Sequence, residues 1–258
     1  MRTYKTPDGE FPSVTTILEV IAKHGLNSWY AKLGEVEAKR QLEAAGERGT
    51  KVHDYIRAAY TQPGISASIA GIDDAHLGYL SSFQKFSYLY PIRPKHLEEM
   101  VWSRIGFAGT LDFLGVSQDA EEFYVIDWKT SSRIYMQHLL QVCAYAAAAT
   151  EQGLVPVKGI KVHPIVVRLK EDGGEPEVKE VLEWKNLFQK GFVAALNLWQ
   201  VSRTGKELYK KVNPFTTSTE GSSPKQTKKA ASSASSAKGL GRGLKSLKME
   251  PAEPILPK

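Results

Sequence analysis

Residues Gly106–Thr130 read GFAGTLDFLGVSQDAEEFYVIDWKT, and the rest of the chain is predicted to be organised around this stretch. It predicts two short strands joined by a polar loop, with Asp112 on the first strand and Asp127 and Lys129 on the second. Side chains alternate between the two faces of a strand, so Asp127 and Lys129 point to one face and Trp128 to the other. Two carboxylates and a lysine in a mostly apolar hairpin are costly to desolvate without a partner. A divalent cation would supply that compensation, so the hairpin predicts a metal site.

Length and composition are those of an ordinary globular protein. A chain of 258 residues suits one large domain, or one domain with an appendage. Its single cysteine, Cys143, excludes an internal disulfide, a CxxC zinc site and a cysteine-ligated iron–sulfur cluster, and it fits a reducing compartment. No apolar run approaches the roughly 18–20 residues that span a bilayer, and the N-terminus has no apolar signal core. We therefore expect a soluble cytoplasmic protein, of cellular or viral origin, without a membrane partner.

Positive charge is concentrated at the C-terminal end of the chain. The formal charge is +6, and residues 205–258 hold 11 Lys and Arg against 4 Asp and Glu, which leaves the first 204 residues at −1. Residues 216–258 are dominated by small polar residues, Ala, Pro and Lys, and cannot bury enough apolar area to offset their ordering entropy. We predict a folded domain over 1–204 and a basic, low-complexity, disordered tail over 205–258. The tail either has no specific role or tethers DNA or a partner.

The order of the predicted elements is typical of an α/β domain with one mixed sheet and an N-terminal helical region. Ser13 is expected to cap a short helix. Apolar spacing predicts further helices over about 28–45 (closed by Gly46), 50–60, 73–90 and 135–151, and a last helix that ends near Ser202. Strands are predicted over about 95–104, 107–116, 123–129, 159–169 and 178–182, and residues 62–70 are expected to form a loop.

Residues that can carry chemistry gather at five places in this order. They are His53, Glu98, Asp112, the pair Asp127 and Lys129, and the pair Gln141 and Tyr145. Mg²⁺ prefers oxygen ligands, takes only a few carboxylates from protein and leaves room for water and phosphate. Asp112 and Asp127 supply such ligands, and Glu98 offers another from the preceding strand. Lys129 is placed to orient or deprotonate a water, or to steady a phosphate. Because metal-bound water is a stronger acid than bulk water, this set predicts hydrolysis of a phosphodiester.

The order of these motifs resembles the RecB-like branch of the PD-(D/E)XK nuclease superfamily, close to the Cas4-like and mitochondrial genome maintenance exonuclease group. That family pairs a strand aspartate in a G-x-a-G-t-l-D context with a following D/E-x-K strand, matched here by Gly109–Asp112 and Asp127–Lys129. A later helix carries Q-x-x-x-Y, matched by Gln141 and Tyr145. An upstream histidine after Gly-Thr is matched within Gly49–His53. The resemblance spans about residues 3–150, and it implies a restriction-endonuclease-like α/β core, so that 1–204 would be the nuclease domain.

The resemblance also implies a role for each matched residue. The metal would be held or supported by His53, Glu98, Asp112, Asp127 and the backbone carbonyl of Trp128. Lys129 would position the attacking water, and Gln141 and Tyr145, one helical turn apart, would brace the site or contact DNA. Leu111 stands where many members have proline, as is common in this branch. The four cysteines of the iron–sulfur Cas4 members are absent, which implies a member without a cluster.

Several of these residues also have an ordinary structural interpretation, which the sequence leaves open. Without the other motifs, His53 would be interpreted as a histidine of the helix surface or of the core. Gln141 and Tyr145 would be interpreted as an ordinary polar contact between helices. Glu98 competes with Glu99, because alternation places them on opposite faces of the strand and only one is needed; the family's spacing favours Glu98. The basic residues that flank the motifs are either phosphate contacts or solvated: Arg48, Lys51, Arg104 and Arg133.

The leading functional prediction is a deoxyribonuclease that uses Mg²⁺ or Mn²⁺. The resemblance implies an exonuclease that acts on single-stranded DNA or DNA ends in replication, recombination or repair, with a helicase, a recombinase or a replication protein as partner. The alternative is a non-catalytic DNA-binding or recombination-accessory module that retains the nuclease fold. A third hypothesis is a scaffolding protein whose tail recruits a partner.

Overall fold

The computed structural model describes residues 1–21, 26–61, 73–156 and 159–212, which belong to one compact unit, Met1–Val212. The loop predicted over 62–70 and the part of the predicted tail from residue 213 onward lie outside the described residues. The strands are β1 (Thr3–Thr6), β2 (Gly9–Pro12), β3 (Arg93–Ser103), β4 (Phe107–Val116), β5 (Glu122–Lys129), β6 (Lys161–Arg168) and β7 (Glu177–Glu180). The helices are α1 (Val14–Leu18), α2 (Leu26–Leu33), α3 (Glu35–Thr61), η2 (Asp74–His76), α4 (Leu77–Leu89), α5 (Met136–Glu151), α6 (Trp184–Leu187), η3 (Phe188–Phe192) and α7 (Val193–Val212).

A five-stranded mixed sheet forms the centre of the fold, as the sequence predicted. Its order is β3-β4-β5-β6-β7, and β1 and β2 form a separate hairpin. All neighbours in the large sheet are antiparallel except β5 and β6, which are parallel and are joined by the crossover helix α5. The strands predicted from the alternating stretch, β4 and β5, pair with Phe113 opposite Ile126 and Val116 opposite Phe123.

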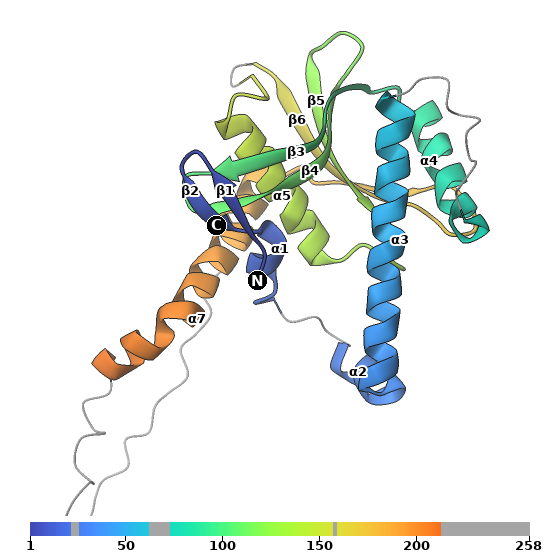
Figure 1. The fold of residues 1–258 in the computed structure, drawn as a ribbon. Coiled ribbons are helices and arrows are strands. Elements are labelled where there is room, and N and C mark those ends of the chain that lie inside the picture. The colour runs from blue at the N-terminus through green and yellow to red at the C-terminus, as the bar shows by residue number, and fades with distance from the viewer. Residues whose placement is uncertain (22–25, 62–72, 157–158, 213–258) are drawn as a thin grey trace, which may run out of the picture. The chain divides into compact units, whose positions relative to one another are not determined.

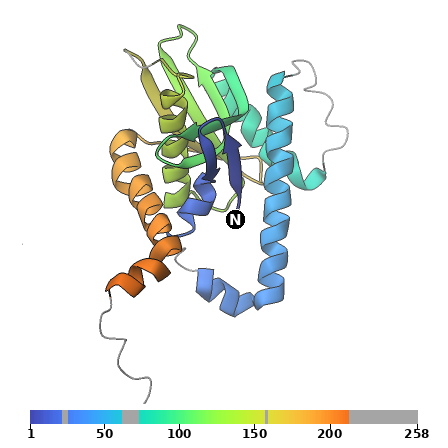
Figure 2. The same cartoon turned by 60° about the vertical axis from the view of Figure 1, so that its left-hand side comes forward.

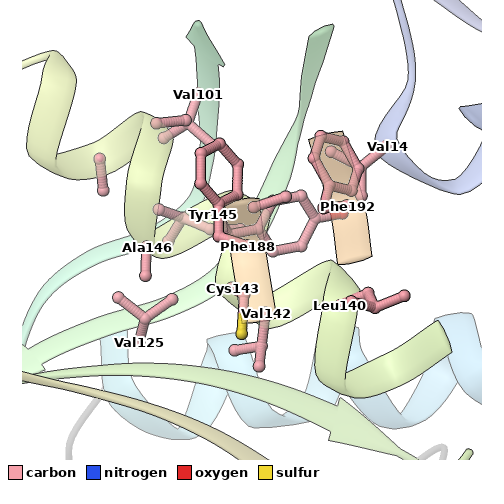
Figure 3. Packing of buried hydrophobic residues seen from close by; sticks show 14 of the residues in the cluster. Val14, Val101, Val125, Leu140, Val142, Cys143, Tyr145, Ala146, Phe188 and Phe192 are labelled. Atoms are coloured by element: carbon pink, nitrogen blue, oxygen red, sulfur yellow. The ribbon is translucent and has the colours of Figure 1, made fainter. Parts of the chain in front are cut away.

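Helices cover the two faces of the sheet (Figures 1 and 2), and an apolar layer is buried on each face. On one face α5 packs with α1, η3 and α7, and the buried side chains of this layer include Val14, Leu140, Tyr145 and Phe192 (Figure 3). On the other face α3 and α4 bury residues such as Val52 and Phe83. Trp128 lies in this second layer and Val125 lies in the first, so β5 alternates as expected.

The helix predicted to end at Gly46 does not end there. The structure has a short helix, α2, followed by one continuous helix of 27 residues, α3, which runs through Gly46 and Gly49. The break falls instead at Gly34, whose φ of 77° lies in the left-handed region that favours glycine. A glycine inside a helix costs only about 1 kcal/mol relative to alanine, so Gly46 did not need to end it. His53 therefore lies on the same helix as residues 35–46.

The last helix is also longer than predicted. A one-turn π-helix, η3, leads into α7, which continues to Val212, about ten residues past the expected end near Ser202. The first eight residues assigned to the tail, 205–212, are therefore helical. The N-terminal prediction is confirmed, since Ser13 caps α1 by accepting a hydrogen bond from the backbone N–H of Thr16 (3.0 Å). None of the helices in the described part of the chain is long and apolar enough to cross a membrane.

Candidate metal centre

Asp127 and Lys129 form a buried ion pair at the end of β5. The Asp127 side chain is fully buried, and the Lys129 Nζ lies 2.5 Å from its Oδ2. Apart from this pair, neither carboxylate oxygen of Asp127 has a hydrogen-bond partner among the described residues. A buried carboxylate normally accepts several hydrogen bonds, so this one retains the capacity to bind a cation.

Asp112 connects β4 to β5 and to α3. Its Oδ2 accepts a hydrogen bond from the backbone N–H of Trp128 (2.9 Å). Its Oδ1 lies 3.5 Å from the Nδ1 of His53. Since the side chain is only 10% exposed, it faces the other charged groups of the site with little screening by water.

His53 enters the site from α3. Its Nε2 lies 3.0 Å from the carbonyl oxygen of Trp128. A carbonyl only accepts, so this nitrogen carries a proton and Nδ1 is the atom directed at Asp112 and Glu98. The carbonyl that the resemblance assigns to a metal thus already accepts one hydrogen bond, and its second lone pair is left for another partner.

Glu98 reaches the site through an unusual backbone conformation. Its φ of 50° is in the left-handed region, although the residue is not a glycine and lies within a strand. Such conformations cost about 1–3 kcal/mol and tend to occur at functional sites. The Glu98 Oε1 lies 3.8 Å from His53 Nδ1, whereas Glu99 instead contacts His96 (3.3 Å). The structure therefore brings Glu98, and not Glu99, to the histidine.

Three donors converge closely enough to hold one ion. One ligand atom each from His53, Glu98 and Asp112 lies within 4.8 Å of the others. Three carboxylates, those of these two acids and of Asp127, provide the oxygen ligands that Mg²⁺ and Mn²⁺ prefer. Asp127 is not one of the three clustered residues, but its carboxylate has only the ion pair with Lys129 among the described residues, and this set of donors fits a divalent cation.

The charged groups of the site shift one another's pKa values. Burial lowers the pKa of His53, but the nearby Asp112 and Glu98 carboxylates outweigh it and raise the pKa to about 9. Burial raises the pKa of Asp112 to about 6, against the opposing effect of protonated His53. Burial also opposes the charge of Lys129, but Asp127 and Asp112 outweigh it and leave the pKa raised. The lysine is therefore a cation at neutral pH.

Gln141 and Tyr145 lie together on α5, as their spacing predicted. The Gln141 Nε2 donates to the Tyr145 hydroxyl (3.0 Å). Burial raises the pKa of Tyr145 well above its usual value, and the nearby Asp127 and Asp112 carboxylates add to this, so the phenol keeps its proton. The ring packs beneath Gly109, where an added Cβ would come within 2.6 Å of it. The glycine of the G-T-L-D stretch is thus required by close packing against the tyrosine.

The flanking basic residues are not part of this cluster. Arg48 stacks over the ring of Tyr79 at 5.7 Å, and its buried Nε has no hydrogen-bond partner in the described part of the chain. Lys51 is exposed on α3. Arg104 approaches Asp8 (3.7 Å), and Arg133 stacks over Tyr135.

Two features of the site had no signal in the sequence. One is the positive φ of Glu98, which no local residue pattern predicts. The other is the hydrogen bond between the hydroxyls of Tyr4 and Thr110 (3.2 Å), which ties the N-terminal hairpin to β4 two residues before Asp112. The two partners are separated by 106 positions, so only the folded chain shows that they meet.

Fold and donor set together are those of a metal-using α/β enzyme. The family model of the PD-(D/E)XK nuclease superfamily matches residues 26–234. This match covers most of the chain, and the protein belongs to that superfamily. Its nucleases use divalent metals and act on DNA. A search of the curated proteins found no match.

Metal binding is expected to release protons and to strengthen as the pH rises. A cation binds the deprotonated forms of its ligands, while Asp112 and His53 hold their protons up to about pH 6 and about pH 9. Below the lower value both ligands are protonated, so affinity for Mn²⁺ should be weakest there and increase toward the higher one, by up to about tenfold per pH unit for each proton displaced.

Isothermal titration with Mn²⁺ in two buffers of different ionisation enthalpy measures this proton release. The His53→Gln variant is the control, because it should bind more weakly and release about one proton fewer in the upper part of that pH interval. An affinity that stays constant between pH 6 and pH 9 would contradict the expectation.

Proposed function

We propose that the protein is a Mg²⁺- or Mn²⁺-dependent deoxyribonuclease, and specifically an exonuclease of the RecB-like, Cas4-like branch that acts on single-stranded DNA or DNA ends. Membership of the superfamily supports the nuclease class. The order of motifs from His53 to Tyr145 supports the narrower branch and the exonuclease mode. One observation carries the proposal, namely that Asp127 is fully buried, lacks hydrogen-bond partners other than its ion pair with Lys129, and lies beside the His53, Glu98 and Asp112 cluster.

In this proposal the metal is held by the carboxylates of Glu98, Asp112 and Asp127, with His53 completing or supporting the set. A bound divalent ion supplies Lewis-acid polarisation of a phosphate and lowers the pKa of a water. Asp112 also has a structural role that does not require a bound metal. By accepting the backbone N–H of Trp128, it fixes β5 against β4 and so fixes the direction of Asp127.

Lys129 acts as a positioned cation in this proposal. Its raised pKa means that it holds its proton in the buried pair, so it donates hydrogen bonds and does not remove a proton from water in that state. An ammonium group at this place can orient an attacking water and stabilise negative charge on the phosphate in the transition state. Gln141 and Tyr145 support the site from α5 in this proposal. The Tyr145 phenol also keeps its proton, and it accepts a hydrogen bond from Gln141.

Cleavage of linear and circular substrates tests the mode of action. We expect linear single-stranded DNA with a fluorescent label to be degraded in Mg²⁺ or Mn²⁺, and a covalently closed single-stranded circle of the same sequence to survive. Addition of EDTA should stop the reaction, since the chemistry needs the ion. Degradation of the circle at the rate of the linear strand would exclude the exonuclease mode while leaving the nuclease assignment intact.

A further inference from the structure

A concave site lies on the edge strand of the sheet, β3, and none of its lining residues belongs to the metal cluster. It is a pocket of about 370 Å³, within the range of about 300–1,000 Å³ that small-molecule sites occupy. Its walls come from β3, from the turn between β1 and β2, and from the C-terminal end of α5 and the residues after it. They include Asp8, Met100, Trp102, Arg104, Glu151 and Gln152.

The indole of Trp102 is the anchored centre of this pocket. Its Nε1 donates to Asp8 Oδ2 (3.0 Å), and its backbone N–H donates to Gln152 Oε1 (3.3 Å). The ring is therefore held in place at a surface that remains partly exposed. An anchored, partly exposed aromatic ring is the kind of group on which an unpaired base stacks.

The polar groups around the ring suit the edge of a base better than a phosphate. Carboxylates line the pocket from three elements, namely Asp8, Glu99 and Glu151, while Arg104 is the single basic residue among its lining residues. This acidic wall repels a phosphodiester, but a carboxylate accepts hydrogen bonds from the exocyclic amino groups of cytosine, adenine and guanine. The carboxylate of Glu151 is itself fixed, since it accepts from the hydroxyl of Ser103 and from the backbone N–H of Arg104.

The pocket and the candidate metal centre share strand β3, which carries Glu98 of the cluster and Trp102 of the pocket. Glu98, Met100 and Trp102 occupy alternate positions of β3, and Met100 is partly exposed between the other two. Four residues of extended chain span about 14 Å, so the indole lies a few nucleotides from the cluster. A single strand whose backbone passes the cluster can place one of its bases over Trp102.

We propose that this pocket binds one unpaired nucleobase of the DNA substrate, a base with an exocyclic amino group, by stacking on Trp102. This inference rests on the proposed function and adds to it a subsite that would select single strands, because a base within a duplex is not free to enter. Trp102 is a binding residue in this scheme and takes no part in the chemistry.

Single abasic residues test the proposal. Binding of labelled single-stranded oligonucleotides is measured by fluorescence anisotropy in EDTA, so that no cleavage is needed, with one abasic residue moved stepwise along the strand. For the wild type we expect one position at which loss of the base weakens binding about tenfold. Trp102→Ala should lose that sensitivity at that position alone, and Trp102→Phe should retain part of it. Restoring cytosine there should strengthen wild-type binding more than restoring thymine.

Tyr88→Ala is the matched control, because Tyr88 is an aromatic residue that is 87% exposed on α4, away from the pocket. It should leave every abasic penalty unchanged. Abasic penalties that are the same in the wild type and in Trp102→Ala would overturn the proposal of a base pocket. Binding of an oligolysine peptide that is lost in Trp102→Ala, while DNA binding is unchanged, would also overturn it and would assign the pocket to a basic protein partner. Cleavage that fails while the Trp102-dependent position persists would overturn the nuclease proposal alone.

Discussion

Asp127→Asn is expected to reduce metal-dependent DNA cleavage by about 1,000-fold, the loss expected when a group that acts on the transition-state charge is removed from a buried site. The amide cannot supply the anionic oxygens that a divalent ion prefers. Lys129→Met should have a loss of similar size, because it removes the cation paired with that carboxylate. The assay is single-turnover cleavage of labelled single-stranded DNA. Glu121→Gln, an exposed acid in the loop of the same hairpin, should cleave like the wild type.

Stability measurements on the same variants separate chemistry from folding. Each single substitution leaves one buried charge without its partner, which costs about 3–5 kcal/mol of unfolding free energy. The double variant Asp127→Asn with Lys129→Met removes both charges, so most of that stability should return while cleavage stays absent. Denaturant unfolding of all four proteins measures the cycle. Additive stability losses, or a double variant that cleaves DNA, would count against the role assigned to the pair.

Trp128→Ala is expected to lower the unfolding free energy by about 3–5 kcal/mol, the usual cost of truncating a large buried aromatic. The side chain is 1% exposed and meets the rings of Phe83, Phe86 and Phe113 edge to face or nearly so, at centroid distances of 5.5, 5.2 and 6.1 Å. These contacts hold α4 against the sheet directly behind the Asp127 and Lys129 pair.

Trp128→Phe makes the comparison sharper. The phenyl ring keeps much of the aromatic packing and removes an indole N–H that is buried without a hydrogen-bond partner in the described part of the chain. Because an unsatisfied buried donor costs about 1–3 kcal/mol, its removal offsets part of the lost volume, and the decrease should be markedly smaller than for alanine. Leu182→Ala, at a side chain that is 80% exposed, should change stability by less than about 0.5 kcal/mol. Equal losses for alanine and phenylalanine at position 128 would refute this account.

The hairpin of β4 and β5 was predictable because its information is local. Alternation along five or more residues fixed which side chains share a face, and it placed Trp128 opposite to Asp127 and Lys129. The helix boundaries were less predictable, because glycine both ends helices and is tolerated within them. Gly34 adopts a positive φ and Gly46 does not, and the residue type alone does not distinguish the two positions.

The site was predictable in its membership and not in its geometry. His53, Glu98 and Asp112 were named from motif order, and the structure brings them together; their roles stay predictions. Glu98 was favoured over Glu99 from the family's spacing, and the structure brings Glu98 to His53 through a positive φ that a regular strand does not have. The pocket around Trp102 joins residues near positions 8, 102 and 151, and no pattern within a single segment connects them.

Because α3 is continuous, His53 is rigidly connected to the N-terminal half of the same helix. A helix of 27 residues is about 40 Å long at about 1.5 Å per residue, and the histidine lies about two thirds of the way along it. Because no break separates residues 35–46 from His53, a tilt of that part of α3 would move the imidazole relative to the Trp128 carbonyl, which lies 3.0 Å from its Nε2. Two separate helices hinged at Gly46 would absorb such a tilt, whereas one continuous helix would transmit it to His53.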